Sequence, residues 1–189
     1  TLKQMNIAEE SGYRTGIAYF YDSNGMLKPS PSANRFTHKI NHGHSLEVIF
    51  EQLAEIVASE RPDIIHYHNL WPASDLLFDE RLPKLAPSVL HEHSCTLTCI
   101  GGARLHERPF QTCSLPLGLA CIVLPPFTRC VVGRRPTRLI KRVIAFRQLP
   151  KQWRDAYLLT PSHFSRDLLV KNGFSEERVY VIPNYSLKH

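Results

Sequence analysis

The chain has 189 residues, of which 43% are hydrophobic and 21% are charged, and this composition is typical of a soluble globular domain. Its net charge of +6 favours an anionic partner, such as a nucleotide, a phospholipid surface or a nucleic acid. No run approaches the roughly 18 apolar residues that a membrane span needs, and the start lacks the basic flank and apolar core of a secretory signal. These observations predict a cytoplasmic domain.

Strand and helix signals alternate along the first half of the chain. We expect a strand over residues 17–21, a loop over 28–38, a helix over 45–60 with Ser45 as its N-cap, and a strand over 63–68. A second helix is predicted over residues 74–86, broken near Pro83, and the next strand over 87–93.

The second half contains one long stretch without periodicity. Residues 94–136 hold five prolines and all five cysteines, and such a stretch is usually a functional loop or an insertion. A basic helix is predicted over 137–148, a strand over 156–160, a helix between Ser162 as N-cap and Gly173 as the C′ residue, and a strand over 178–183.

The order of these elements indicates an α/β fold. Short apolar strands that alternate with helices are typical of a Rossmann-like parallel sheet with helices on both faces. Ligands bind such sheets at the carboxyl ends of the strands. Polar residues stand at four predicted strand ends: His66, His68, His91, His93, Ser162 and Asn184.

The predicted basic helix lies in a strongly cationic part of the chain. Eight basic residues and no acidic residue occur between Val131 and Arg154. Helical spacing places Leu139, Ile140, Val143 and Ile144 on one face, and puts four basic residues elsewhere around the helix: Arg138, Lys141, Arg142 and Arg147. The helix is either an ordinary surface helix packed by its apolar side, or one that faces a membrane or phosphate groups.

The five cysteines allow several states. Cys95 and Cys99 have the spacing of a zinc-ligand pair, whereas Cys113, Cys121 and Cys130 do not pair closely, and His91, His93 or His106 could complete a set. An odd number of cysteines leaves one outside any disulfide framework. A structural zinc, a disulfide and free thiols stay open as alternatives; we expect buried or free thiols and no cofactor.

Three segments resemble glycosyltransferase family 4. "RPDIIHYHN" looks like a strand of the family that ends in paired histidines. "AYLLTPSHFSRDLLVKNGFSEERVYVIPNYS" is similar to its run of strand, serine-capped helix, glycine and strand ending in Pro-Asn. "HSCTLTC" matches a subset that has a histidine, a cysteine six residues later and a cysteine-rich insertion; His93, Cys99 and Cys113 fit this spacing.

The resemblance implies the N-terminal, acceptor-side half of an enzyme with the GT-B fold of two Rossmann-like domains. All 189 residues would form this half, with a cysteine-rich insertion over about 94–136, and the donor-binding domain would lie outside them. Such enzymes transfer a sugar from a nucleotide-sugar donor with retention of configuration and need no catalytic metal. The implied acceptor is a glycan or a lipid-linked molecule, which would suit a cytoplasmic enzyme associated with an anionic membrane surface.

The resemblance also implies roles for single residues. His93 corresponds to the histidine that lies against the donor sugar, so it is the predicted catalytic residue. The residues expected to bind the acceptor or line the cleft are His91, His68, Asn69, Ser162, His163 and Asn184. A non-catalytic nucleotide-binding or scaffold module on the same fold is the alternative. A basic, zinc-stapled nucleic-acid binder is disfavoured by the regular alternation of strands and helices, so no nucleic-acid partner is expected.

Overall fold

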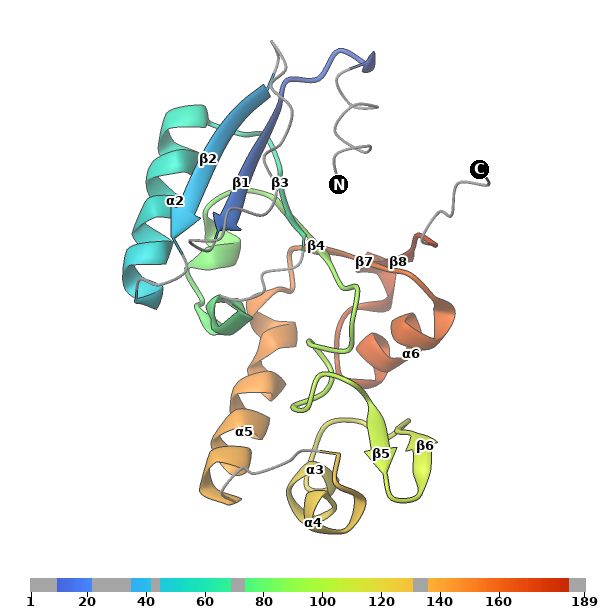
Figure 1. Cartoon of the computed structure of the whole chain (residues 1–189). Helices are drawn as coiled ribbons and strands as arrows, with labels where there is room; N and C mark the ends of the chain where they lie inside the picture. The colour runs from blue at the N-terminus through green and yellow to red at the C-terminus, as the bar shows by residue number, and fades with distance from the viewer. Residues whose placement is uncertain (1–9, 22–34, 42–44, 69–73, 131–135, 184–189) are drawn as a thin grey trace. The chain divides into compact units, whose positions relative to one another are not determined.

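The computed structural model describes residues 10–21, 35–41, 45–68, 74–130 and 136–183 (Figure 1). The chain divides into two compact units. One comprises residues 1–63 and 70–76, and the other comprises residues 64–69 and 77–189. The first unit contains two strands and a helix, and the second contains the larger sheet with His66, His68, His91 and His93.

The described residues of the first unit include two parallel strands and a helix that packs against one of them. Strands β1 (Thr15–Tyr21) and β2 (Arg35–Asn41) pair in parallel, and α2 (Leu46–Glu60) packs against β2. The hydroxyl of Ser45 accepts a hydrogen bond from the Val48 N–H at 3.4 Å, so the predicted N-cap of α2 is confirmed. The predicted loop over 28–38 is wrong for its last residues, because β2 begins at Arg35.

The second unit is built around a four-stranded parallel sheet. Its strands are β3 (Ile65–His68), β4 (Ser88–His91), β7 (Tyr157–Thr160) and β8 (Val179–Val181), and they lie side by side in that order (Figure 1). Alternate residues of these strands are buried, including Tyr67, Leu90, Leu158 and Val179. The predicted α/β class with a Rossmann-like parallel sheet is therefore confirmed.

Helix α6 (His163–Lys171) connects β7 to β8 and packs against both strands. Leu168 and Leu169 of this helix are buried, whereas Phe164 is 46% exposed. The helix ends at Asn172, and Gly173 follows with φ of 96°, a left-handed conformation that costs glycine little. The predicted C′ glycine is confirmed, and a short 3₁₀ turn over Glu176–Arg178 then leads into β8.

Helix α5 (Pro136–Gln152) is anchored at its C-terminal end by Trp153, which is 1% exposed. The indole N–H of Trp153 donates to the Leu77 carbonyl at 3.0 Å, and its ring meets Tyr67 edge to face. The predicted helix over 74–86 is wrong. Two 3₁₀ turns stand there instead, Ser74–Phe78 and Leu82–Lys84, and Pro83 has no N–H for a continuous α-helix.

Residues 94–130 contain small elements that the sequence did not indicate. Strands β5 (Leu105–Glu107) and β6 (Phe110–Thr112) form an antiparallel hairpin, and the one-turn helices α3 (Ala120–Val123) and α4 (Pro125–Thr128) follow. Arg104 organises this segment, although it is charged and only 3% exposed. Its guanidinium donates to the backbone carbonyls of Thr98, Cys113 and Leu115, so one side chain joins the turn at Thr98 to the stretch that follows β6.

Candidate functional site at the carboxyl ends of β3 and β4

The site arises from the register of two neighbouring parallel strands. His68 is the last residue of β3, and it lies directly opposite His91, the last residue of β4. Side chains alternate between the two faces of a strand, so the burial of Tyr67 and Leu90 on one face directs both histidines to the other. The hydroxyl of Tyr67 donates to the Leu82 carbonyl at 3.1 Å, which fixes β3 in this register.

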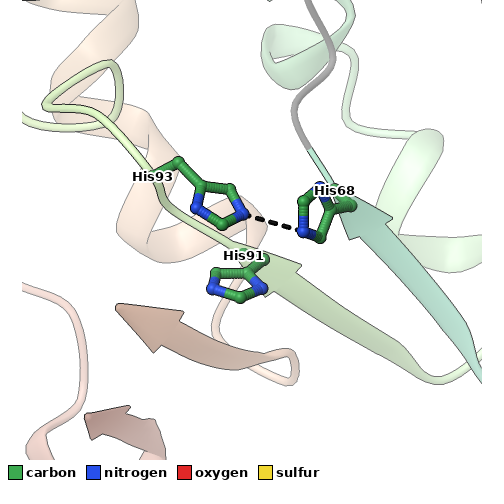
Figure 2. A group of neighbouring side chains, drawn as sticks. All are labelled: His68, His91 and His93. Carbon is green, nitrogen blue, oxygen red and sulfur yellow. Dashed lines mark hydrogen bonds between the residues drawn. The ribbon is translucent and has the colours of Figure 1, made fainter. Parts of the chain in front are cut away.

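Four imidazole rings gather at this edge of the sheet. The Nε2 atoms of His68 and His93 are 2.8 Å apart and share a hydrogen bond, and Figure 2 shows His91 beside this pair. The ring centres of His91 and His93 are 3.9 Å apart, and those of His68 and His91 are 4.9 Å apart. His66 stacks on the other side of His91, with 5.4 Å between the ring centres.

The packing of these rings keeps them neutral. Desolvation, and then the repulsion that charged neighbouring histidines would exert, lowers the pKa of His66, His68 and His91 to about 4. Desolvation also lowers the pKa of His93. A neutral imidazole has one N–H donor and one nitrogen acceptor, so near pH 7 the group can both donate to and accept from a polar ligand.

His91 is the buried member of the cluster. Its side chain is 5% exposed, and neither ring nitrogen has a hydrogen-bond partner among the described residues. His93 is exposed and His68 is half-buried, so the cluster opens to solvent on the side of His93. An unsatisfied buried polar ring is unusual in a folded protein, and at a strand end it is typical of a binding site.

Glu92 holds the turn that follows β4, a role that sequence reasoning missed. Its carboxylate accepts hydrogen bonds from the backbone N–H groups of Thr96 at 2.7 Å and Leu97 at 3.2 Å. Burial raises the pKa of Glu92 to about 8, although these hydrogen bonds favour the ionised form. Glu92 therefore shapes the loop beside the histidines and does not face them, because strand alternation turns it away from His91 and His93.

The remaining predicted cleft residues have different outcomes. Ser162 follows β7 at the same edge of the sheet, but its hydroxyl accepts from the Ser165 N–H at 3.2 Å as the N-cap of α6. His163 is the first residue of α6 and is exposed. Asn69 and Asn184 lie outside the described residues. The structure therefore brings together three of the predicted site residues, His68, His91 and His93, and adds His66.

The basic patch on α5 differs partly from its prediction. Leu139 and Val143 are buried as expected, but Ile140 is 42% exposed and Ile144 is 57% exposed, so the four do not share one packed face. Arg138, Lys141 and Arg147 are exposed. Arg142 is half-buried, with its guanidinium 5.5 Å from the centre of the Phe146 ring, so it belongs to the packing of α5 more than to its surface.

All five cysteines are free and half-buried, including the candidate metal ligands Cys95, Cys99 and Cys113. Burial raises the pKa of the Cys95 and Cys121 thiols, which disfavours the thiolate that a metal binds. Among the described residues, three potential metal ligands have donor atoms within 4.8 Å of one another at one place, and they are His68, His91 and His93. His106 is buried in β5, with its Nδ1 3.4 Å from the side-chain nitrogen of Gln111.

A hollow of about 700 Å³ lies at the other end of the strands. Ser88, at the start of β4, and Ala156, which precedes β7, contribute to its wall. In a parallel α/β sheet the opposite, carboxyl ends bind ligands, so this hollow is not the candidate site.

Comparison with known families identifies the chain. The model of Glycosyltransferase Family 4 matches residues 28–185, which include the whole histidine cluster. The chain therefore belongs to glycosyltransferase family 4, as the resemblance implied, and it is a transferase domain whose general activity is glycosyl transfer. A search of the curated proteins found no match. Within the described residues, no helix has the length and apolar character that crossing a membrane requires.

Proposed function

We propose that the chain is the acceptor-side half of a retaining GT-B glycosyltransferase that uses a nucleotide-sugar donor. The observation that carries this proposal is the group of neutral imidazoles at the carboxyl edge of the parallel sheet, within the region that matches the family. This half would hold the acceptor hydroxyl close to the anomeric carbon, which is a positioning contribution to the rate. A second Rossmann-like domain would hold the nucleotide and stabilise the leaving diphosphate with positive charge.

His93 is the proposed catalytic residue, because it is the exposed one of the three histidines whose donor atoms lie together. Its imidazole can donate to one sugar hydroxyl and accept from another. The hydrogen bond between His93 and His68, 2.8 Å long, holds the ring at the open edge of the group. The buried ring of His91, 3.9 Å from that of His93, supports it from below and is proposed to position it.

The acceptor is proposed to be a glycan or a lipid-linked molecule. The support is the outward face of α5, where the exposed cations Arg138, Lys141 and Arg147 accompany the exposed apolar residues Ile140 and Ile144. A face that combines cations with apolar side chains suits the surface of an anionic leaflet. Such a contact would keep the enzyme where lipid-linked acceptors are.

A kinetic comparison in the intact enzyme tests the role of His93. We expect His93→Ala to lower kcat by about 100-fold, the scale of losing one donor to a transition state, while the melting temperature changes little because His93 is exposed. His93→Gln should recover part of the rate, since an amide can also donate and accept. His66→Ala is the matched control, because His66 is exposed at the same edge and should lower kcat by less than about threefold.

A second test asks whether glycosyl transfer requires both domains. The 189-residue chain alone should transfer no sugar, because the group that stabilises the leaving diphosphate would belong to the other domain. Measurable transfer by the isolated chain would contradict the two-domain proposal, and wild-type turnover in His93→Ala would contradict the assignment of His93.

A further inference from the structure

We infer that His68, His91 and His93 form a binding site for one divalent transition-metal ion, with zinc as the representative ion. The three side chains come from the ends of adjacent strands, and each offers a ring nitrogen within 4.8 Å of the other two (Figure 2). Three histidines around an ion that keeps one further position open are a common arrangement in zinc proteins.

The buried ring of His91 is the strongest sign that this group binds something. A neutral imidazole inside a protein normally has partners for its N–H and for its bare nitrogen, and leaving either one unsatisfied destabilises the fold. Neither nitrogen of His91 has a partner among the described residues, and the ring is 5% exposed. A metal ion would bind the bare nitrogen and remove that part of the penalty.

The spacing of the nitrogens is close to what a zinc ion needs. Two nitrogens at about 2.0–2.1 Å from a tetrahedral zinc are about 3.3 Å apart. The Nε2 atoms of His68 and His93 are 2.8 Å apart, and all three ligand nitrogens lie within 4.8 Å, so closure requires shifts of about 1–2 Å. The ring torsion of histidine is soft, and His93 is exposed and has room to turn.

The chemistry of the donors selects the ion. Three neutral imidazoles suit zinc, copper and nickel, whereas calcium and magnesium require oxygen ligands, which this group does not contain. The cysteines are a separate set, because among the described residues the group of potential metal ligands consists of His68, His91 and His93 and includes no cysteine. The ion should therefore have nitrogen ligands and a water molecule, with no sulfur.

Metal binding goes beyond the proposed function and can be measured without any sugar. Both roles use the imidazole of His93, so a bound ion would take the ring away from a sugar hydroxyl. If the chain does not bind metal, the proposed catalytic role of His93 in glycosyl transfer is unaffected. Conversely, normal turnover in a His93 variant would contradict the catalytic role of His93 and would not count against metal binding.

The experiment is a titration of the purified, metal-free chain with zinc and with cobalt, in a phosphine reductant that keeps the thiols reduced. We expect saturation at about one ion per chain. His93→Ala and His68→Ala should each weaken binding by at least about 100-fold. Losing a residue that only hydrogen-bonds to a metal ligand costs about 10–100-fold in affinity, and losing a ligand should cost at least as much. His163→Ala is the matched control and should change affinity by less than about twofold, because His163 is an exposed histidine at the start of α6 and is outside the group of three.

Cobalt reports the ligands directly and keeps the test independent of folding. The cobalt-loaded chain should show visible bands of a four-coordinate nitrogen and oxygen site, without the near-ultraviolet charge-transfer band of thiolate ligands, and Cys95→Ser with Cys99→Ser should leave the spectrum unchanged. A thiolate band, equal affinity in the His93→Ala and His68→Ala variants, or no saturable binding at micromolar zinc would overturn the site. Circular dichroism on each variant shows that the fold is retained.

Discussion

The side-chain oxygen of Asn172 accepts a hydrogen bond from the backbone N–H of Leu117 at 2.7 Å. The same amide donates from Nδ2 to the Leu168 carbonyl at 2.6 Å, so one side chain both caps α6 and ties the cysteine-rich segment to that helix. Asn172 and Leu117 are 55 positions apart in the chain. This contact links the cysteine-rich segment, residues 94–130, to α6 of the second unit.

Replacing Asn172 by Ala should therefore loosen that segment. We expect a loss of about 1–3 kcal/mol in the free energy of unfolding, because the Leu117 N–H and the Leu168 carbonyl lose a partner. Hydrogen exchange at the Leu117 amide should accelerate more than exchange in the sheet. Lys171→Ala, at the exposed neighbouring position, is the control, and equal exchange at Leu117 in both variants would show that the contact carries no stability.

Trp153→Phe tests the anchor of α5. The substitution keeps an aromatic ring against Tyr67 but removes the N–H that donates to the Leu77 carbonyl. We expect a loss of about 2 kcal/mol, from the unpaired carbonyl and the smaller ring. Urea unfolding measures it. Tyr157→Phe, which changes an exposed aromatic residue, should have almost no effect, and a Trp153→Phe variant as stable as that control would contradict the role of the indole.

Arg104→Met tests whether one buried guanidinium organises the cysteine-rich segment. The variant keeps an unbranched side chain but leaves the carbonyls of Thr98, Cys113 and Leu115 without their donor. We expect a loss of about 3 kcal/mol or more, since hydrogen bonds to a charged group contribute about 1.5–3 kcal/mol each. The exposed Arg108 provides the control, Arg108→Met. Similar urea midpoints for the two variants would show that Arg104 is not the organiser.

The cationic face of α5 predicts binding to anionic vesicles. Each Lys or Arg near an anionic leaflet contributes roughly 1 kcal/mol, so replacing Arg138, Lys141 and Arg147 by Ser should remove most of the attachment. Arg142 is kept, because it packs over Phe146. Cosedimentation at low and at high salt measures the effect, which screening should weaken.

Neutral vesicles are the control for that experiment. They should not retain the chain, because the proposed attachment depends on charge. Equal binding to both kinds of vesicle, or binding to neither, would leave α5 as an ordinary surface helix and would favour a soluble acceptor.

The sequence predicted the elements whose signals are local. The cap of α2 at Ser45 and the glycine after α6 lie where periodicity and capping residues placed them. Strand β2 was missed because its residues carry a weak alternation and β1 supplies its partner from a distance. The apolar spacing over residues 74–84 predicts a helix, whereas the structure has 3₁₀ turns there, whose carbonyls at Leu77 and Leu82 accept hydrogen bonds from Trp153 and Tyr67.

The residues of the candidate site could be predicted from the sequence, but their arrangement in space could not. Histidines at the ends of two strands were visible in the sequence, and the family resemblance singled out His93. Sequence alone does not say which strands are neighbours, so the direct pairing of His68 with His91 needed the sheet order. The part of Arg104 could not be foreseen, because nothing local distinguishes a buried arginine from the many exposed ones.

The pairing of His68 with His91 also limits how these two strands can change length. Deleting one residue of β3 before Tyr67 would turn His68 to the face that Tyr67 now occupies, and Tyr67 to the face of the histidine cluster. The reason is that successive side chains of a strand point to opposite faces. Deleting two would preserve the facing but shift His68 by about 6.6 Å along the strand, too far to meet its partner. Relatives should therefore keep the lengths of β3 and β4 fixed, together with the turn that Glu92 holds through Thr96 and Leu97.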